Sequence, residues 1–145
     1  MTQGLSLSEF VGFVRAARMG VVATASPSGE PEAALVGIAV SDRGELVFDT
    51  PSGARKVANI ERNDRVAVVI GWDDGVSVQV EGTARVVNDD ERAGYERIYA
   101  SQFPGSRVTD PSFAVAVLTP NWVRRYDATS DPARCEHANW LTGPA

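Results

Sequence analysis

The chain has 145 residues, of which 43% are hydrophobic and 23% charged, a composition typical of one soluble globular domain. The formal net charge of −5 and the lack of a basic run argue against a nucleic-acid-binding surface. The single cysteine excludes an intramolecular disulfide, and no apolar run approaches the roughly 20 residues that span a bilayer. We therefore expect one cytoplasmic domain over residues 1–145, with no membrane segment and an irregular tail over 128–145.

The first half of the chain predicts one helix and three strands. Ser6 and Glu9 have the spacing of a capping box, and apolar residues follow at helical intervals up to a stop at Gly20. Strands are predicted over 21–26, 32–40 and 45–49, separated by the turn sequences 27–30 and 41–44.

The second half predicts two helices and four strands. A short helix is expected over 55–62, a buried strand over 65–72 and an alternating strand over 76–87. A helix capped by Asn88 or Asp89 follows as far as Gln102, and two last strands are expected over 113–118 and 122–126. About seven strands joined by hairpins favour an antiparallel barrel.

The junction between the strand 45–49 and the helix 55–62 carries two adjacent cations, Arg55 and Lys56. They lie in the first turn of the helix, where the partial positive charge of a helix N-terminus disfavours cations unless an anion is bound. Together with free backbone amides and the hydroxyls of Thr50 and Ser52, they would hold a phosphate. The alternative is a solvated pair on the helix surface, and the residues alone leave both interpretations open.

Six short motifs follow one another along the chain: Gly29-Glu30-Pro31, Phe48-Asp49-Thr50, Arg55-Lys56, Asn59-Ile60, Gly71-Trp72 and Val78-Gln79-Val80-Glu81-Gly82. In this order they resemble the pyridoxamine 5′-phosphate oxidase-like family of FMN-binding proteins. The resemblance covers residues 21–87. It implies a mostly β fold, a six- to seven-stranded antiparallel split β-barrel with flanking helices.

The same resemblance implies a homodimer that holds FMN in a cleft between the subunits. Arg55 and Lys56 would bind the FMN phosphate, and the strand that ends at Thr50 would contact the isoalloxazine ring through its backbone. Flavin carries the redox chemistry, so no catalytic residue is assigned. The implied cofactor-binding residues are Phe48, Asp49, Thr50, Ser52, Arg55, Lys56, Ser77 and Gln79.

Departures from the family pattern limit what the resemblance implies about the substrate. Where pyridoxal phosphate-forming members have an arginine for the flavin phosphate, this chain has Ala34. Ala54 replaces a serine before the Arg-Lys pair, and Ser77 replaces a glutamine. The basic C-terminal motif for a substrate phosphate is missing. Pyridoxamine phosphate is therefore not the expected substrate.

The expected activity is oxidation or reduction of a small molecule, with NAD(P)H as a candidate reductant. A deazaflavin-dependent reductase and a non-enzymatic flavin- or haem-binding protein remain as alternatives, the last with His137 as a candidate ligand. Cys135 and His137 supply two ligands at most, so no metal site is predicted. Trp122 and Trp140 are late aromatics that could stack on a flavin, although core packing is the better explanation for Trp122.

Overall fold

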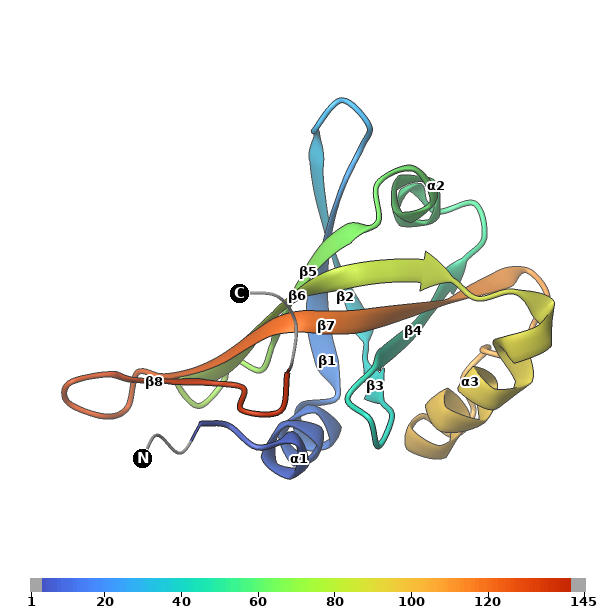
Figure 1. Cartoon of the computed structure of the whole chain (residues 1–145). Coiled ribbons are helices and arrows are strands. Elements are labelled where there is room, and N and C mark those ends of the chain that lie inside the picture. Colours follow the sequence, from blue (N-terminus) through green and yellow to red (C-terminus); the bar gives the residue numbers. More distant parts are fainter. Residues whose placement is uncertain (1–3, 142–145) are drawn as a thin grey trace.

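The computed structural model describes residues 4–141 and contains one antiparallel sheet that curls into a split barrel, with three helices packed around it (Figure 1). The helices are α1 (Leu7–Ala17), α2 (Arg55–Arg62) and α3 (Asp89–Gln102). The strands are β1 (Met19–Ala25), β2 (Pro31–Gly37), β3 (Ala39–Val40), β4 (Leu46–Pro51), β5 (Arg65–Ile70), β6 (Val76–Val86), β7 (Phe113–Asp127) and β8 (Arg134–His137). The predicted fold class is confirmed, with eight strands in place of the six or seven expected.

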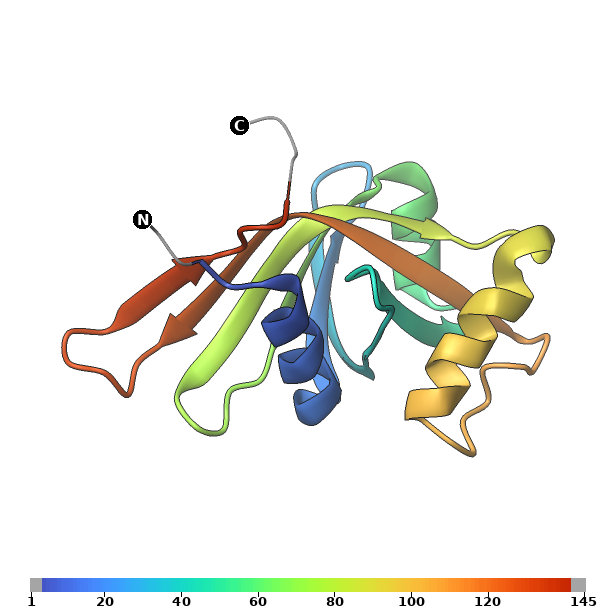
Figure 2. The same ribbon diagram turned by 60° about the horizontal axis from the view of Figure 1, so that its bottom comes forward.

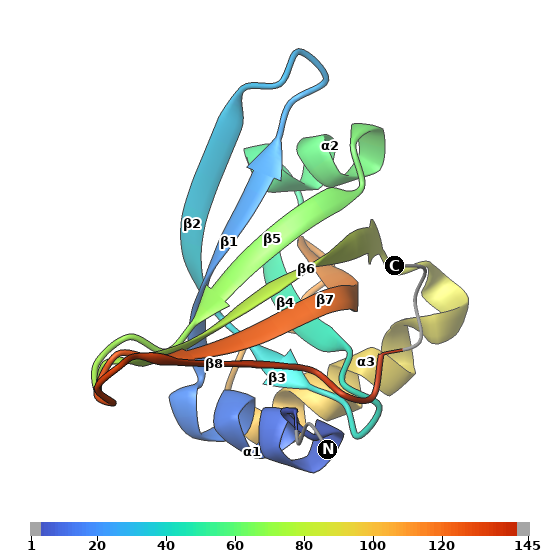
Figure 3. The same ribbon diagram turned by 60° about the vertical axis from the view of Figure 1, so that its left-hand side comes forward.

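The strand order is β2-β1-β5-β6-β7-β4-β3, and β8 pairs with β7 outside this path. Every pairing is antiparallel. The sheet curls far enough that β2, at one end of the order, contacts β4 near the other end (Figure 3). Because β2 and β4 do not pair, the barrel stays open along one line.

Local signals set the start of α1 as predicted. The Ser6 hydroxyl accepts from the Glu9 amide at 3.1 Å, and the Ser6 amide donates to the Glu9 carboxylate at 3.0 Å. The helix ends earlier than expected, because Arg18 takes a positive φ of 67° and donates its amide to the Val14 carbonyl. Gly20 is consequently the second residue of β1 and not a helix stop.

The region expected to hold two C-terminal strands forms one continuous strand, β7. Pro120, which cannot donate to a ladder, lies where the β6 register shifts between Glu81 and Gly82. A Cβ at Gly82 would lie 2.1 Å from the Thr119 carbonyl oxygen, so this bulge requires glycine. In the opposite sense, the single strand predicted over 32–40 is interrupted at Ile38, whose amide donates to the Arg18 carbonyl.

The tail expected to be irregular contains β8. This strand pairs with the last residues of β7, and together they extend away from the barrel as a hairpin (Figures 1 and 2). Beyond β8, Trp140 folds back onto α1, with its ring centroid 5.5 Å from that of Phe10. The prediction of an irregular tail was therefore wrong for residues 134–137. Their backbone groups hydrogen-bond to the C-terminal end of β7, a long-range pairing that the sequence pattern does not indicate.

Two apolar clusters stabilise this arrangement. The larger fills the inside of the curled sheet and includes Phe10, Phe48 and Leu118. The smaller lies between α3 and the opposite face of β4 and β7, with Tyr95 and Tyr99 at its centre. Over residues 4–141, no helix is both long and apolar enough to cross a membrane.

Candidate functional site

The opening of the barrel lies between two strand edges that have no strand partner in the described part of the chain. β2 pairs with β1 alone, and β3 pairs with β4 only as far as Val47. Residues 48–51 of β4 therefore pair with β7 on one side only. We call these two facing edges, residues 31–37 and 48–51, the split. Unpaired amides and carbonyls along strand edges can hydrogen-bond a flat polar ligand.

Helix α2 closes one end of the split and is tied to strands on both sides of it. Lys56 Nζ donates to Thr50 Oγ1 of β4 at 3.1 Å. Asn59 Nδ2 donates to Thr24 Oγ1 of β1 at 3.0 Å. Both threonines are 3% exposed. The structure thus brings together two of the predicted phosphate-site residues, Thr50 and Lys56, in a half-buried position.

The third connection of α2 is ionic and involves a residue that the sequence did not single out. Arg55 Nε lies 3.0 Å from Glu32 Oε2 of β2, with the arginine side chain 86% exposed and the glutamate side chain 12% exposed. The two groups lack hydrogen-bond geometry, and Oε2 has no hydrogen-bond partner among the described residues. An acidic side chain therefore sits against one of the two predicted phosphate ligands.

The N-terminus of α2 has the character of an anion site. Its N-cap is Ala54, which has no side chain able to cap, and no acidic residue occupies the first turn of this fully described helix. First-turn amides and the helix dipole therefore keep their partial positive charge. Ser52 is exposed in the preceding turn, where its amide donates to the Ser112 carbonyl at 2.9 Å. Its hydroxyl donates to no side chain or carbonyl within residues 4–141.

A buried tyrosine from α3 contacts the C-terminal end of β2. Tyr99 Oη lies 3.4 Å from the Gly37 carbonyl oxygen of β2, and a Cβ at Gly37 would come within 2.8 Å of it. Burial, followed by the negative charge of Asp49 on β4, raises the pKa of Tyr99 far above its ordinary value. The phenol therefore keeps its proton. Asp49 and Tyr99 place one charged and one neutral polar group beside the two free edges.

Of the predicted ring-contacting residues, Phe48 can contribute only its backbone. Its side chain is fully buried in the larger core cluster. Its neighbour Asp49 is half-buried on the α3 side of the strand, next to Tyr99. Contact of β4 with a ligand through its backbone groups stays a prediction.

Ser77 and Gln79 lie on the other face of the sheet from the α2 contacts. Cross-strand pairing aligns one row across six strands, composed of Leu35, Val21, Val69, Gln79, Arg124 and His137. Successive side chains alternate between faces, and the alternate row holds the buried residues Val22 and Val80. The Gln79 row therefore faces outward, whereas Thr24 and Glu32 face the inside. One copy of the chain does not bring Gln79 to Lys56.

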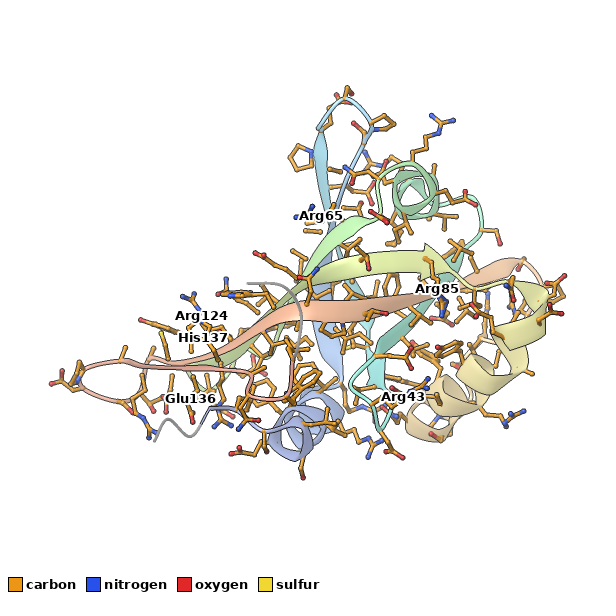
Figure 4. All side chains as sticks on the ribbon, viewed as in Figure 1. Arg43, Arg65, Arg85, Arg124, Glu136 and His137 are labelled. Atoms are coloured by element: carbon orange, nitrogen blue, oxygen red, sulfur yellow. The ribbon has the colours of Figure 1, made fainter. Side chains whose placement is uncertain are left out.

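The outward row contains an ordered arginine that the sequence did not single out. Arg124 Nη2 donates to Gln79 Oε1 at 2.5 Å, and the guanidinium lies 5.6 Å from the Trp122 ring centroid and 5.9 Å from that of Tyr126. His137 meets the edge of Trp122 with a centroid distance of 5.8 Å. In Figure 4, Arg124 and His137 lie on one side of the β7–β8 hairpin and Glu136 on the other.

The late aromatics separate into two roles. Trp122 lies on the same outward face as Arg124, where it is half-buried, and is not part of either core cluster. Trp140 packs against the larger cluster and α1. Cys135 is exposed on β8. Within residues 4–141, no three His, Cys, Asp or Glu side chains gather closely enough to hold a metal ion.

The residues missed from the sequence are those whose partners lie far away along the chain. Glu32, Tyr99 and Arg124 meet Arg55, Gly37 and Gln79 across separations of 23, 62 and 45 residues, respectively. Glu32 carried one usable signal, since it is the polar residue of an otherwise apolar strand. Tyr99 and Arg124 carried none that distinguishes them from ordinary core and surface positions.

Comparison with known proteins places this chain in a family. The family model for pyridoxamine 5′-phosphate oxidase matches residues 7–127. A pyridoxine/pyridoxamine 5′-phosphate oxidase from Rubrobacter xylanophilus is 38% identical over 89 residues, which cover 61% of this chain and 40% of the relative. The match therefore spans less than half of the length of that curated protein.

Solved structures with the same fold are more distant in sequence. A haem-binding protein from Mycobacterium smegmatis has a TM-score of 0.74 at 20% identity, with 90% of this chain and 57% of that chain covered. A conserved hypothetical protein from Mycobacterium tuberculosis gives 0.71 at 22%, with 83% of each chain covered. A pyridoxamine 5′-phosphate oxidase-related, FMN-binding protein from Nostoc punctiforme gives 0.65 at 15%, covering 89% and 85%. With most of its length matched by the family model and its fold shared with these structures, the chain belongs to the pyridoxamine 5′-phosphate oxidase family.

Proposed function

We propose that this protein binds FMN and acts as a small-molecule oxidoreductase. The observation that carries the proposal is the position of α2, whose cationic, uncapped N-terminus lies at the end of two unpaired strand edges. A cofactor with a phosphate on a flexible chain and a flat polar ring has the matching shape and chemistry.

The donor set fits a phosphate. Lys56 supplies an ammonium that is already held at Thr50, Arg55 supplies a guanidinium open to solvent, and the first turn of α2 supplies amides. Charge-assisted hydrogen bonds of this kind are about twice as strong as neutral ones. Glu32 opposes the fit by one negative charge, so the site is cationic but only weakly.

The split fits the ring. Its two edges offer backbone donors and acceptors to the polar rim of an isoalloxazine. Bound FMN would supply hydride transfer between a reductant such as NAD(P)H and a small-molecule acceptor. The residues of the chain bind and orient: Tyr99 holds a proton at Oη near Gly37, and Lys56 fixes the phosphate end.

A second copy of the chain completes this proposal. Ser77 and Gln79 face away from α2, so they can reach a ligand in the split only if that split belongs to a partner. The outward face also exposes apolar side chains on strands β1, β2, β5 and β7: Met19 at 36%, Leu35 at 58%, Val69 at 37% and Tyr126 at 37%. Burial of such a surface is the usual driving force for a homodimer.

Haem is the second candidate, supported by two observations. His137, the only histidine of the chain, is exposed beside Trp122 and Arg124, and a haem-binding protein from Mycobacterium smegmatis shares the fold. A deazaflavin, which also carries a phosphate, would use the same cationic turn as FMN. The visible absorption spectrum distinguishes the three, because oxidised flavin, deazaflavin and haem absorb in different bands.

The test is an equilibrium binding titration with FMN, in which quenching of the FMN fluorescence measures the bound fraction. We expect the wild-type chain to bind FMN, and the double variant Arg55→Ala with Lys56→Ala to lose it while its circular dichroism spectrum is unchanged. Unaltered FMN affinity in the double variant would refute the assigned site. Stoichiometric haem binding that depends on His137, with no FMN binding, would transfer the proposal to haem.

A further inference from the structure

The ion pair between Arg55 and Glu32 is difficult to explain as a stabilising contact. Arg55 is 86% exposed, and an ion pair with so exposed a partner contributes little to folding. Glu32 is 12% exposed, so its carboxylate has lost most of its hydration. Its Oε2 atom makes no hydrogen bond with the described residues. The carboxylate of Glu32 is thus held at the proposed anion site, and hydrogen bonds do not fully replace the hydration that it has lost.

The neighbours of Glu32 leave its charge directed at the helix terminus. The residue paired with it on β1 is Thr24, whose hydroxyl already accepts from Asn59. Lys56 is directed to Thr50 on the far side of the split. Arg55 is therefore the cation that Glu32 meets, and it is also one of the two cations, with Lys56, that the proposed site offers to a phosphate.

We propose that Glu32 is a specificity-determining residue of this anion site. Its carboxylate competes with the phosphate of a ligand for Arg55 and repels that phosphate in proportion to its charge. The site is consequently less selective for doubly charged phosphate monoesters over singly charged phosphodiesters than it would be without Glu32. This inference rests on the proposed binding of a flavin phosphate at α2 and adds the residue that sets the charge preference.

The expected size of the effect follows from Coulomb's law. The repulsion between Glu32 and a ligand scales with the ligand charge, so its removal changes the logarithm of the affinity twice as much for a dianion as for a monoanion. At a partly solvated site we expect about a threefold gain for a monoanion and about a tenfold gain for a dianion. A neutral ligand should gain nothing.

The test compares wild type with Glu32→Gln, which removes the charge and keeps the shape. Three probes share one ring: riboflavin, which is uncharged, riboflavin 4′,5′-cyclic phosphate, which is a monoanion, and FMN. At about pH 7.5 the FMN phosphate is a dianion. We expect dissociation constants to fall about tenfold for FMN, about threefold for the cyclic phosphate and not at all for riboflavin.

Glu61→Gln is the matched control, because Glu61 is an exposed glutamate near the opposite end of α2. It should leave all three constants unchanged. Glu32→Ala repeats the test should the glutamine variant fold poorly, and thermal melting monitors both. Equal or weaker FMN binding in the folded variants would overturn the inference and assign Glu32 to positioning Arg55.

The same titrations separate this inference from the proposed function. FMN binding that depends on Lys56 but is unaffected by Glu32→Gln sustains the flavin site and overturns the role of Glu32. If neither the wild type nor Glu32→Gln binds FMN at all, the proposed function and the inference fall together. An equal gain in affinity for all three probes would also overturn the role of Glu32. Such a gain is independent of ligand charge and would indicate a change in the shape of the split.

Discussion

Lys56 should contribute more to phosphate binding than Arg55, although the two are adjacent. Lys56 is half-buried and held at Thr50 by a hydrogen bond of 3.1 Å, whereas Arg55 is 86% exposed and faces Glu32. A prepositioned cation loses little side-chain entropy on binding, and its partial burial strengthens its attraction for an anion. We therefore expect Lys56→Met to weaken FMN binding more than Arg55→Met.

The magnitudes follow from the two environments. A hydrogen bond to a charged group contributes about 1.5–3 kcal/mol when it is sheltered, which corresponds to about a 10- to 150-fold loss of affinity for Lys56→Met. An exposed ion pair contributes about 0.2–1 kcal/mol, and Arg55 already has a competing partner in Glu32. Arg55→Met should thus cost about two- to fivefold.

The assay is FMN fluorescence titration at low ionic strength, with Arg62→Met as the control. Arg62 lies in the last turn of the same helix, exposed and distant from the N-terminus of α2. Its loss tests whether overall charge alone affects binding. The reasoning is refuted if Arg55→Met weakens FMN binding more than Lys56→Met, or if either variant is indistinguishable from Arg62→Met.

Three further predictions concern the fold around the site. Burial alone would raise the pKa of Glu45, but hydrogen bonds from Tyr95 and Arg43 outweigh it and lower this pKa below 4.5. The charged Glu45 therefore stabilises the fold above pH 4.5, and this stabilisation is lost as the pH falls through the lowered pKa. In urea unfolding, Glu45→Gln should be about 1 kcal/mol less stable than the wild type at neutral pH, and the difference should vanish in acid. Gly82→Ala should lower the stability by several kcal/mol in the same assay, because its Cβ would lie 2.1 Å from a backbone oxygen and the bulge cannot yield; a loss below about 1 kcal/mol would contradict this. Val69→Glu, on the outward face, should leave a folded monomer in sedimentation, and a persisting dimer would place the interface elsewhere.

Local chemistry carried most of what the sequence predicted correctly. The helix over 55–62 was predicted with its exact bounds, since its apolar residues Val57 and Ile60 and its preceding turn are all local features. Asn88, one of the two cap residues predicted for α3, is its N-cap in the structure. The boundary at the end of α1 failed, because Arg18 adopts a conformation that a distant contact to Ile38 supports.

Long-range geometry explains what could not be predicted. Pro120 breaks a strand in isolation, yet it continues β7 because Gly82 on the neighbouring strand admits a bulge. The candidate site follows the same rule. Thr50 and Lys56 are close in sequence and were assigned together, but Glu32 and Tyr99 enter from β2 and α3 once the sheet has curled.

Strand β2 brings a negative charge to the split, whereas the family pattern has a positive charge on this strand. At position 34, where the pattern has an arginine, the chain has alanine. Two residues earlier, on the same face of β2, Glu32 adds a negative charge beside Arg55. A single strand thus both omits a cation and supplies an anion. Because α2 is tied to both sides of the split through Arg55 and Lys56, the proposed phosphate site predicts that this strand affects both the affinity for a phosphate and its dependence on ligand charge.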